Sequence, residues 1–145
     1  MTKYEDFVQQ ELRDRLAPGE PINHMAVLFN KSLAGMVLLG ALGSLGQGYF
    51  LAAATDRRVF LLKTRMGLFA LKRENLGVVE VPYQDITSIE PGGALTQRTV
   101  KFTLRDGSTL PFRLNTMARF TAGQKTFLTS LPSYVAAWNG QRHAA

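Results

Sequence analysis

Apolar and polar residues alternate through the middle of the chain, a pattern typical of short antiparallel β-strands. The clearest example is VKFTLRDGSTLPFRL, where every second residue is apolar on either side of Asp106-Gly107. This arrangement predicts a hairpin with one buried and one polar face. Turn residues such as Met66-Gly67 and Pro91-Gly92-Gly93 separate further apolar runs. The expected strands cover residues 22–29, 49–54, 59–64, 68–72, 78–83, 86–89, 99–104 and 109–114.

A helix is predicted before the strands. The apolar residues from Tyr4 to Leu16 recur at helical spacing, and Pro18-Gly19 ends the pattern. Thr2 and Glu5 have the spacing of a capping box. The apolar stripe of this helix either packs on its own domain or docks onto a partner.

A second helix is predicted after the strands. Residues Met117 to Trp138 carry apolar side chains at three-, four- and seven-residue spacings, with a kink or break expected at Pro132. Gly140 is expected to stop this helix, and residues 141–145 to form a frayed tail. Serial strands followed by a helix indicate the α+β class.

One segment, residues 33–46, contains no charged residue and reads LAGMVLLGALGSLG. As a helix it would span only about 21 Å, against the ~30 Å hydrocarbon core of a bilayer. Its glycines weaken any helix by up to about 1 kcal/mol each relative to alanine. Three interpretations stay open: a buried helix or hairpin, an apolar loop that touches lipid or self-associates, and a membrane-spanning helix that extends to Ala54.

The stretch ATDRRVFLLKT sets Asp56 beside two arginines and directly before an apolar run. It fits either a charged site or a tight turn between strands. Thr55 and Asp56 have short acceptor side chains that bond nearby backbone N–H groups, as a turn requires. We therefore interpret it as a turn, after which Arg57 and Arg58 enter the next strand with their charged groups in solvent or paired to acids.

Composition narrows the possible chemistry. The chain has 145 residues, which suits one domain, and it contains no cysteine, so disulfides and thiolate chemistry are excluded. Its two histidines, His24 and His143, indicate neither a catalytic triad nor a metal cluster. The formal charge of +6 favours acidic partners. The N-terminal residues lack the apolar core of a secretory signal, and we expect a cytoplasmic protein.

Three segments and the terminal helix together resemble the bacterial pleckstrin-homology (PH)-like domains of the YokE-like kind. They are GYFLAAATDRRVFLLKT, VEVPYQDITSIE and VKFTLRDGSTLPFRL. The resemblance implies a PH-like barrel of two roughly orthogonal antiparallel sheets, about seven strands in all, capped by the C-terminal helix. Phe127 and Trp138 would face the sheet core. The helix near the N-terminus would be an addition to this fold.

The resemblance also implies a division of the chain. Residues 1–17 would form the amphipathic helix, residues 18–140 the PH-like domain with an apolar glycine-rich insertion at 31–48, and residues 141–145 the tail. In eukaryotic relatives the loop between the first two strands carries basic residues that hold inositol phosphates. Here that loop has Lys31 as its one basic residue, which disfavours a phosphoinositide ligand.

These observations favour a non-enzymatic binding or assembly module, with no catalytic residue, cofactor or metal. The expected partner is another protein or a second copy of the chain, and the candidate surface is apolar: Leu38, Leu39, Leu42 and Leu45. The alternative is a peripheral membrane domain that binds anionic lipid through this loop and a basic patch. That patch comprises Lys31, Arg57, Arg58, Lys63, Arg65, Lys72 and Arg73.

Nucleic acid is disfavoured as a partner, because the aromatic residues of the strands fall at core positions instead of forming stacking platforms. The residues in question are Phe60, Phe69, Phe102 and Phe112.

Overall fold

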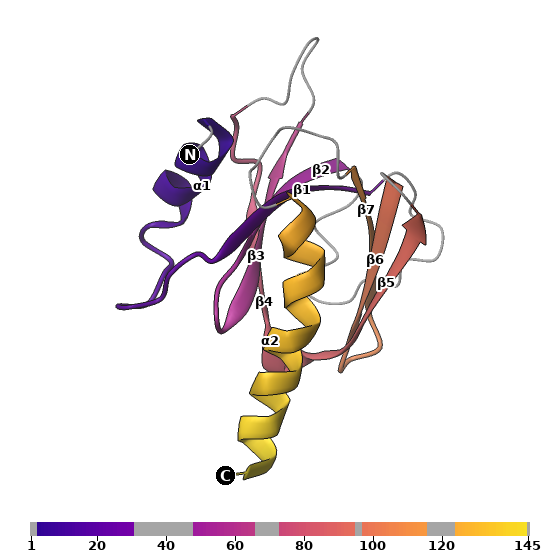
Figure 1. Ribbon diagram of the computed structural model, residues 1–145. Helices are drawn as coiled ribbons and strands as arrows, with labels where there is room; N and C mark the ends of the chain where they lie inside the picture. The colour runs from indigo at the N-terminus through magenta and orange to yellow at the C-terminus, as the bar shows by residue number, and fades with distance from the viewer. Residues whose placement is uncertain (1–2, 31–47, 66–72, 95–96, 116–123, 145) are drawn as a thin grey trace.

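The structure is a computed structural model, and we describe residues 3–30, 48–65, 73–94, 97–115 and 124–144 (Figure 1). A short helix, α1 (Lys3–Leu12), precedes the strands, and a long helix, α2 (Gln124–Ala144), follows them. The strands are β1 (His24–Asn30), β2 (Gly48–Ala54), β3 (Arg58–Thr64), β4 (Val78–Pro82), β5 (Ile86–Ala94), β6 (Gln97–Leu104) and β7 (Thr109–Asn115), with a 3₁₀ turn, η2 (Tyr83–Asp85), between β4 and β5.

All seven strands are antiparallel and follow the order β4-β3-β2-β1-β7-β6-β5. Hairpin pairing builds two groups, β1 to β4 and β5 to β7, and these meet where Phe29 of β1 pairs with Arg113 of β7. In Figure 1, α2 lies between the two groups of strands. The result is the predicted α+β, PH-like arrangement of seven antiparallel strands with a C-terminal helix.

The inner core lies between the two groups of strands and α2. Alternate residues of each strand point into it, because successive side chains of a strand face opposite sides. From α2, Phe127 and Leu131 are fully buried in it, and Trp138 packs against it half-buried, as the sequence predicted. Phe60, Phe102 and Phe112 are buried core residues, as expected, although Phe60 belongs to the outer core described next.

A second, outer core lies on the opposite face of β1, β2 and β3, beneath α1. Tyr4, Val8 and Leu12 of α1 are buried against Leu51 and Phe60 of the sheet. The helix near the N-terminus therefore packs on its own domain. Strand β2 is consequently covered on both faces, which explains why its small residues 52–54 are fully buried.

The structure corrects three boundaries expected from the sequence. Pro91-Gly92-Gly93 lies inside β5 instead of ending a strand; β5 is at the edge of the sheet, where proline removes no necessary hydrogen bond. Helix α2 is not broken at Pro132, where a kink or a break was expected, and it continues through Gly140 to Ala144. An interior glycine costs about 1 kcal/mol relative to alanine, which is too little to stop a helix by itself.

Other expectations fall on residues outside the described part of the chain. These are the capping residue Thr2, the strand at 68–72, Phe69, and the apolar segment 33–46 with its three interpretations. Of the helices that the structure describes, neither is long and apolar enough to span a bilayer.

Candidate functional site

The turn between β2 and β3 is organised by Thr55, whose side chain is fully buried. Its hydroxyl oxygen accepts hydrogen bonds from the backbone N–H groups of Arg57 and Arg58, at 3.0 and 3.1 Å. The backbone N–H of Thr55 donates to the Arg58 carbonyl at 3.0 Å. The stretch is therefore the turn that the sequence predicted, although Asp56 is exposed and pairs with Arg57 at 3.6 Å.

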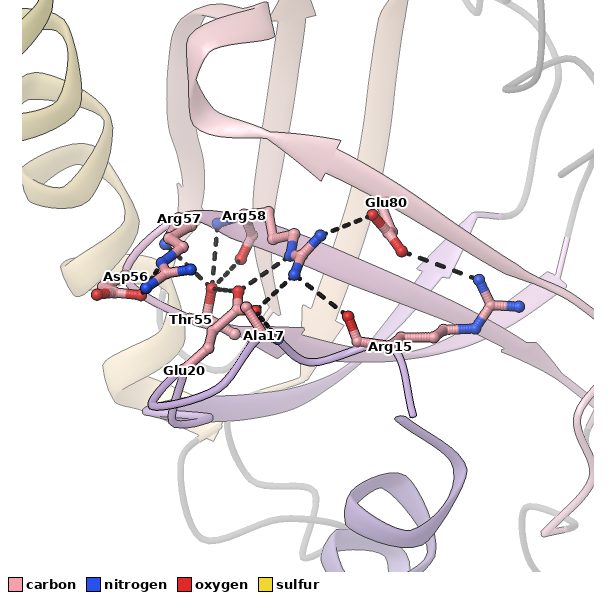
Figure 2. A network of polar contacts seen from close by, with 8 residues as sticks. All are labelled: Arg15, Ala17, Glu20, Thr55, Asp56, Arg57, Arg58 and Glu80. Carbon is pink, nitrogen blue, oxygen red and sulfur yellow. Dashed lines mark hydrogen bonds and ion pairs between the residues drawn. The ribbon is translucent and has the colours of Figure 1, made fainter. Parts of the chain in front are cut away.

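Glu20 lies beneath this turn, and its side chain is completely buried. Three groups donate to its carboxylate. Arg58 does so twice, from Nη2 to Oε1 at 2.5 Å and from Nε to Oε2 at 2.9 Å; the Thr55 hydroxyl donates at 2.7 Å and the Ala17 amide at 2.9 Å. Figure 2 shows these contacts converging on one carboxylate. A buried carboxylate requires such complete pairing, because desolvation of an unpaired charge is costly.

The electrostatics of this carboxylate follow from its partners. Burial by itself would raise the pKa of Glu20. Hydrogen bonds from Arg58, Ala17 and Thr55, together with the charge of Arg58, outweigh that effect and lower the pKa from 4.5 to about 2. Glu20 is therefore ionised at neutral pH.

Arg58 connects this carboxylate to two further parts of the chain. Its Nη1 donates to Glu80 of β4 at 2.9 Å, and its Nη2 donates to the backbone carbonyl of Arg15 at 3.2 Å. The guanidinium also lies over the ring of Phe60, at 4.9 Å from the centroid. We call Glu20, Thr55, Arg58 and Glu80 the polar lock, since together they hold the segment after α1 against the β2–β3 turn and β4.

The polar lock is a set of contacts in which the Glu20 carboxylate is fully paired. Both oxygens of Glu20 accept hydrogen bonds from protein donors, which leaves the carboxylate without a free position for a substrate. Within the described ranges no group of three His, Asp or Glu residues is placed to hold a metal ion. The sequence interpretation of the stretch as a structural turn therefore agrees with the geometry.

A second polar cluster continues from the turn to α2. The Tyr83 hydroxyl, which is buried, donates to the Thr55 carbonyl at 2.6 Å. The Tyr83 ring stacks on Tyr134 of α2, with ring centroids 5.9 Å apart, and the Tyr134 hydroxyl lies 3.2 Å from His24 Nε2. Burial is the main factor that raises the pKa of Tyr83 well above its ordinary range. The β2–β3 turn thus contacts the N-terminal segment directly and is connected to the C-terminal helix through Tyr83.

Replacement of Tyr83 by phenylalanine is expected to lower the free energy of unfolding by about 1 kcal/mol, because the Thr55 carbonyl loses a buried donor. Urea denaturation would measure the change. Tyr134→Phe is the matched control; its hydroxyl is less buried, and we expect a smaller loss. An equal loss of unfolding free energy in both variants would mean that the Tyr83 hydrogen bond contributes no more to stability than the Tyr134 hydroxyl does.

The candidate basic patch is partly neutralised in the structure. Arg57 pairs with Asp56, Arg58 with Glu20 and Glu80, and Arg65 with Glu74 at 2.9 Å. Glu90, the acidic residue of β5, pairs with Lys101 of β6, which is not a candidate of this patch.

The remaining candidate residues are not brought into one site by the described structure. Lys63 is half-buried on β3, and Arg73 is exposed before β4. Six candidates lie outside the described residues: Lys31, Lys72, Leu38, Leu39, Leu42 and Leu45.

Sequence reasoning missed Glu20, the central residue of the polar lock. It stands between Gly19 and Pro21 in a segment without regular periodicity, 38 positions from Arg58. A glutamate between turn residues is ordinarily solvated, so no local signal marks it as buried.

Comparisons with known proteins support the fold and assign no family. No family model matches the chain, and no curated protein matches it. Among solved structures, the C-terminal domain of an unknown protein from Leishmania infantum aligns with a TM-score of 0.55 and 13% identity, covering 91% of this chain and 97% of that one. The hSac2 domain of the human phosphoinositide phosphatase Sac2 aligns with a TM-score of 0.50 and 10% identity, covering 90% and 78%. At these identities the likeness concerns the fold alone.

Proposed function

We propose that this protein is a non-enzymatic PH-like module that works by contact with another protein or with a second copy of itself. The observation that carries the proposal is the architecture, seven antiparallel strands and a C-terminal helix, together with its similarity in fold to the hSac2 domain. Such a fold fits a binding module. Because one fold hosts many functions, the choice of a protein partner is our inference.

The polar lock supports the non-enzymatic part of the proposal. The charged residues that stand out in the sequence, Asp56, Arg57 and Arg58, are engaged with each other or with Glu20 and Glu80. Because they are paired in this way, these three charged residues can be explained as contacts that stabilise the fold. A nucleophile or general base would require an accessible position beside a substrate.

Solution mass, measured without detergent over a range of protein concentrations and at low and high salt, tests the proposal. We expect an oligomer whose mass depends on concentration and not on salt, since apolar contacts are weakly screened. Residues 33–46 are the contact that we propose. Leu38, Leu39 and Leu42 replaced together by serine should therefore yield a monomer, whereas Leu76→Ser, at an exposed position, should not.

A salt-insensitive monomer that binds phosphatidylserine vesicles would instead support the alternative function, a peripheral membrane domain. In that case binding should fall steeply as salt rises, since anionic headgroups attract basic residues at about 1 kcal/mol per charge. A monomer that binds neither phosphatidylserine vesicles nor any protein tested as a partner would contradict both proposals.

A further inference from the structure

The net positive charge is concentrated in the last third of the chain. Residues 97–145 contain seven Lys and Arg and one Asp, whereas residues 1–96 contain ten basic and ten acidic residues. The whole formal charge of +6 therefore arises after residue 96. The described residues of this part of the chain include β6, β7 and α2.

Part of this charge lies on one face of the β5–β7 group. Val100 and Phe102 of β6 and Phe112 of β7 point into the inner core. Side chains alternate along a strand, so Thr99, Lys101 and Arg113 point to the opposite face. We call this face, with the residues Glu90, Thr99, Lys101, Pro111 and Arg113, the β5–β7 outer face.

The strand register places the two cations close together on this face. Arg113 lies directly opposite Thr99, and Lys101 lies opposite Pro111, so Lys101 and Arg113 are diagonal neighbours whose Cα atoms are about 7–8 Å apart. Thr99, directly opposite Arg113, adds a hydroxyl group that can form a hydrogen bond on the same face. Two cationic residues with this backbone separation can pair with alternate carboxylates, at positions i and i+2, of one extended acidic segment.

The β5–β7 outer face is accessible. Thr99 and Arg113 are exposed, and the side chain of Lys101 keeps 47% of its surface in solvent. Helix α1 covers the neighbouring part of the sheet, because the buried sheet residues beneath it belong to β1, β2 and β3. Within the described residues no acidic side chain lies at ion-pair distance from Arg113.

Lys101 is paired with Glu90 at 3.1 Å, but this pair lies in solvent, and Glu90 is 61% exposed. Exposed pairs contribute only about 0–1 kcal/mol. An incoming carboxylate can therefore displace Glu90 at little cost. Glu90 then acts as a weak internal competitor for the partner.

We propose that the β5–β7 outer face binds an acidic polypeptide segment of a partner protein; this inference rests on the proposed function and names the chemistry of the partner. Charge complementarity is the argument for it. A membrane is a poorer match, because the single large apolar side chain found exposed in the described residues, Leu76, lies before β4 and not on this face. The aromatic residues of β6 and β7 face the core, so base stacking has no platform on these strands.

The test measures binding of a fluorescein-labelled oligo-glutamate peptide to the full chain at low salt, by fluorescence anisotropy. Lys101→Glu with Arg113→Glu is expected to weaken binding at least about tenfold, because two attractive contacts become repulsive. The matched control, Arg57→Glu with Arg73→Glu, changes the net charge equally and should weaken binding no more than about twofold. Glu90→Gln should strengthen binding by about threefold, since it removes the competitor.

Three results would overturn this inference. One is equal weakening by both charge-reversed variants, which would indicate a general charge effect. Another is binding of phosphatidylserine vesicles or single-stranded RNA, but not of oligo-glutamate, with the same dependence on Lys101 and Arg113. The last is a titration of the wild-type protein with oligo-glutamate in which the amide NMR signals of Thr99, Lys101 and Arg113 do not shift. If the solution mass shows no oligomer while oligo-glutamate still binds through Lys101 and Arg113, self-association is rejected and the binding of an acidic segment is retained.

Discussion

Replacing Arg58 with alanine is expected to lower the free energy of unfolding by about 3–5 kcal/mol, because the buried Glu20 carboxylate would lose two of its donors and its only opposite charge in the polar lock. The loss includes the contacts of Arg58 with Glu80, the Arg15 carbonyl and the Phe60 ring. Urea denaturation at about pH 7 would measure it. A domain of ordinary stability has about 5–15 kcal/mol in total, so the variant would be marginally folded.

Arg57→Ala is the matched control for this prediction. Arg57 is the adjacent residue, carries the same charge and pairs with Asp56 in an exposed position. Its replacement should change the free energy of unfolding by no more than about 0.5 kcal/mol. If Arg58→Ala costs as little as Arg57→Ala, the polar lock does not stabilise the fold. Replacing Glu20 and Arg58 together by methionine should restore part of the loss, because no unpaired charge would then be buried.

The pH dependence of the same variant identifies the carboxylate responsible. The pKa of Glu20 is lowered from 4.5 to about 2 on folding, so its ionised form stabilises the folded state above about pH 4.5. That contribution, about 3 kcal/mol by linkage, is lost as the pH falls from 4.5 toward 2. The difference in stability between the wild type and Arg58→Ala should therefore narrow below pH 4.5. A difference that stays constant would assign the effect to packing of Arg58.

The sequence was sufficient to predict the elements that depend on local chemistry. The β6–β7 hairpin forms on both sides of Asp106-Gly107, where the Asp106 carboxylate accepts the Ser108 backbone N–H at 2.8 Å. The turn at Thr55 likewise uses a short side chain bonded to the next backbone amides. Periodicity located β2, β3, β7 and the two helices. These features follow from contacts between residues close in the sequence, which a pattern records directly.

The polar lock could not be predicted, because its parts come from three separate segments. Glu20 precedes the first strand, Thr55 and Arg58 flank a turn, and Glu80 lies in β4. Only the tertiary fold brings them together. For the same reason the sequence assigned Arg58 to a basic surface patch, whereas its side chain is only 21% exposed and paired on two sides. The charge of a residue is visible in a sequence, but its burial depends on distant partners.

The docking of α1 leads to the second large effect that we expect. Leu12 is fully buried between α1 and the sheet, in the outer core. Leu12→Ala should lower the free energy of unfolding by about 2–5 kcal/mol, through lost burial and the cavity left behind. Leu76→Ala is the control: Leu76 is 52% exposed, so its replacement should have little effect. Both changes are measured by urea denaturation, and equal effects would contradict docking of α1 on this sheet.

Combining Leu12→Ala with Arg58→Ala tests whether α1 and the polar lock stabilise the domain as one unit. Leu12 ends α1, and the Arg15 carbonyl that accepts a hydrogen bond from Arg58 follows three residues later. A helix released from the sheet would leave that segment less ordered, so the second substitution should cost less than it does alone. We expect the combined loss to fall short of the sum by more than about 0.5 kcal/mol, the usual limit for independent sites. A strictly additive result would mean that α1 docks independently of the lock, and that the salt bridge to Glu20 stabilises only the turn.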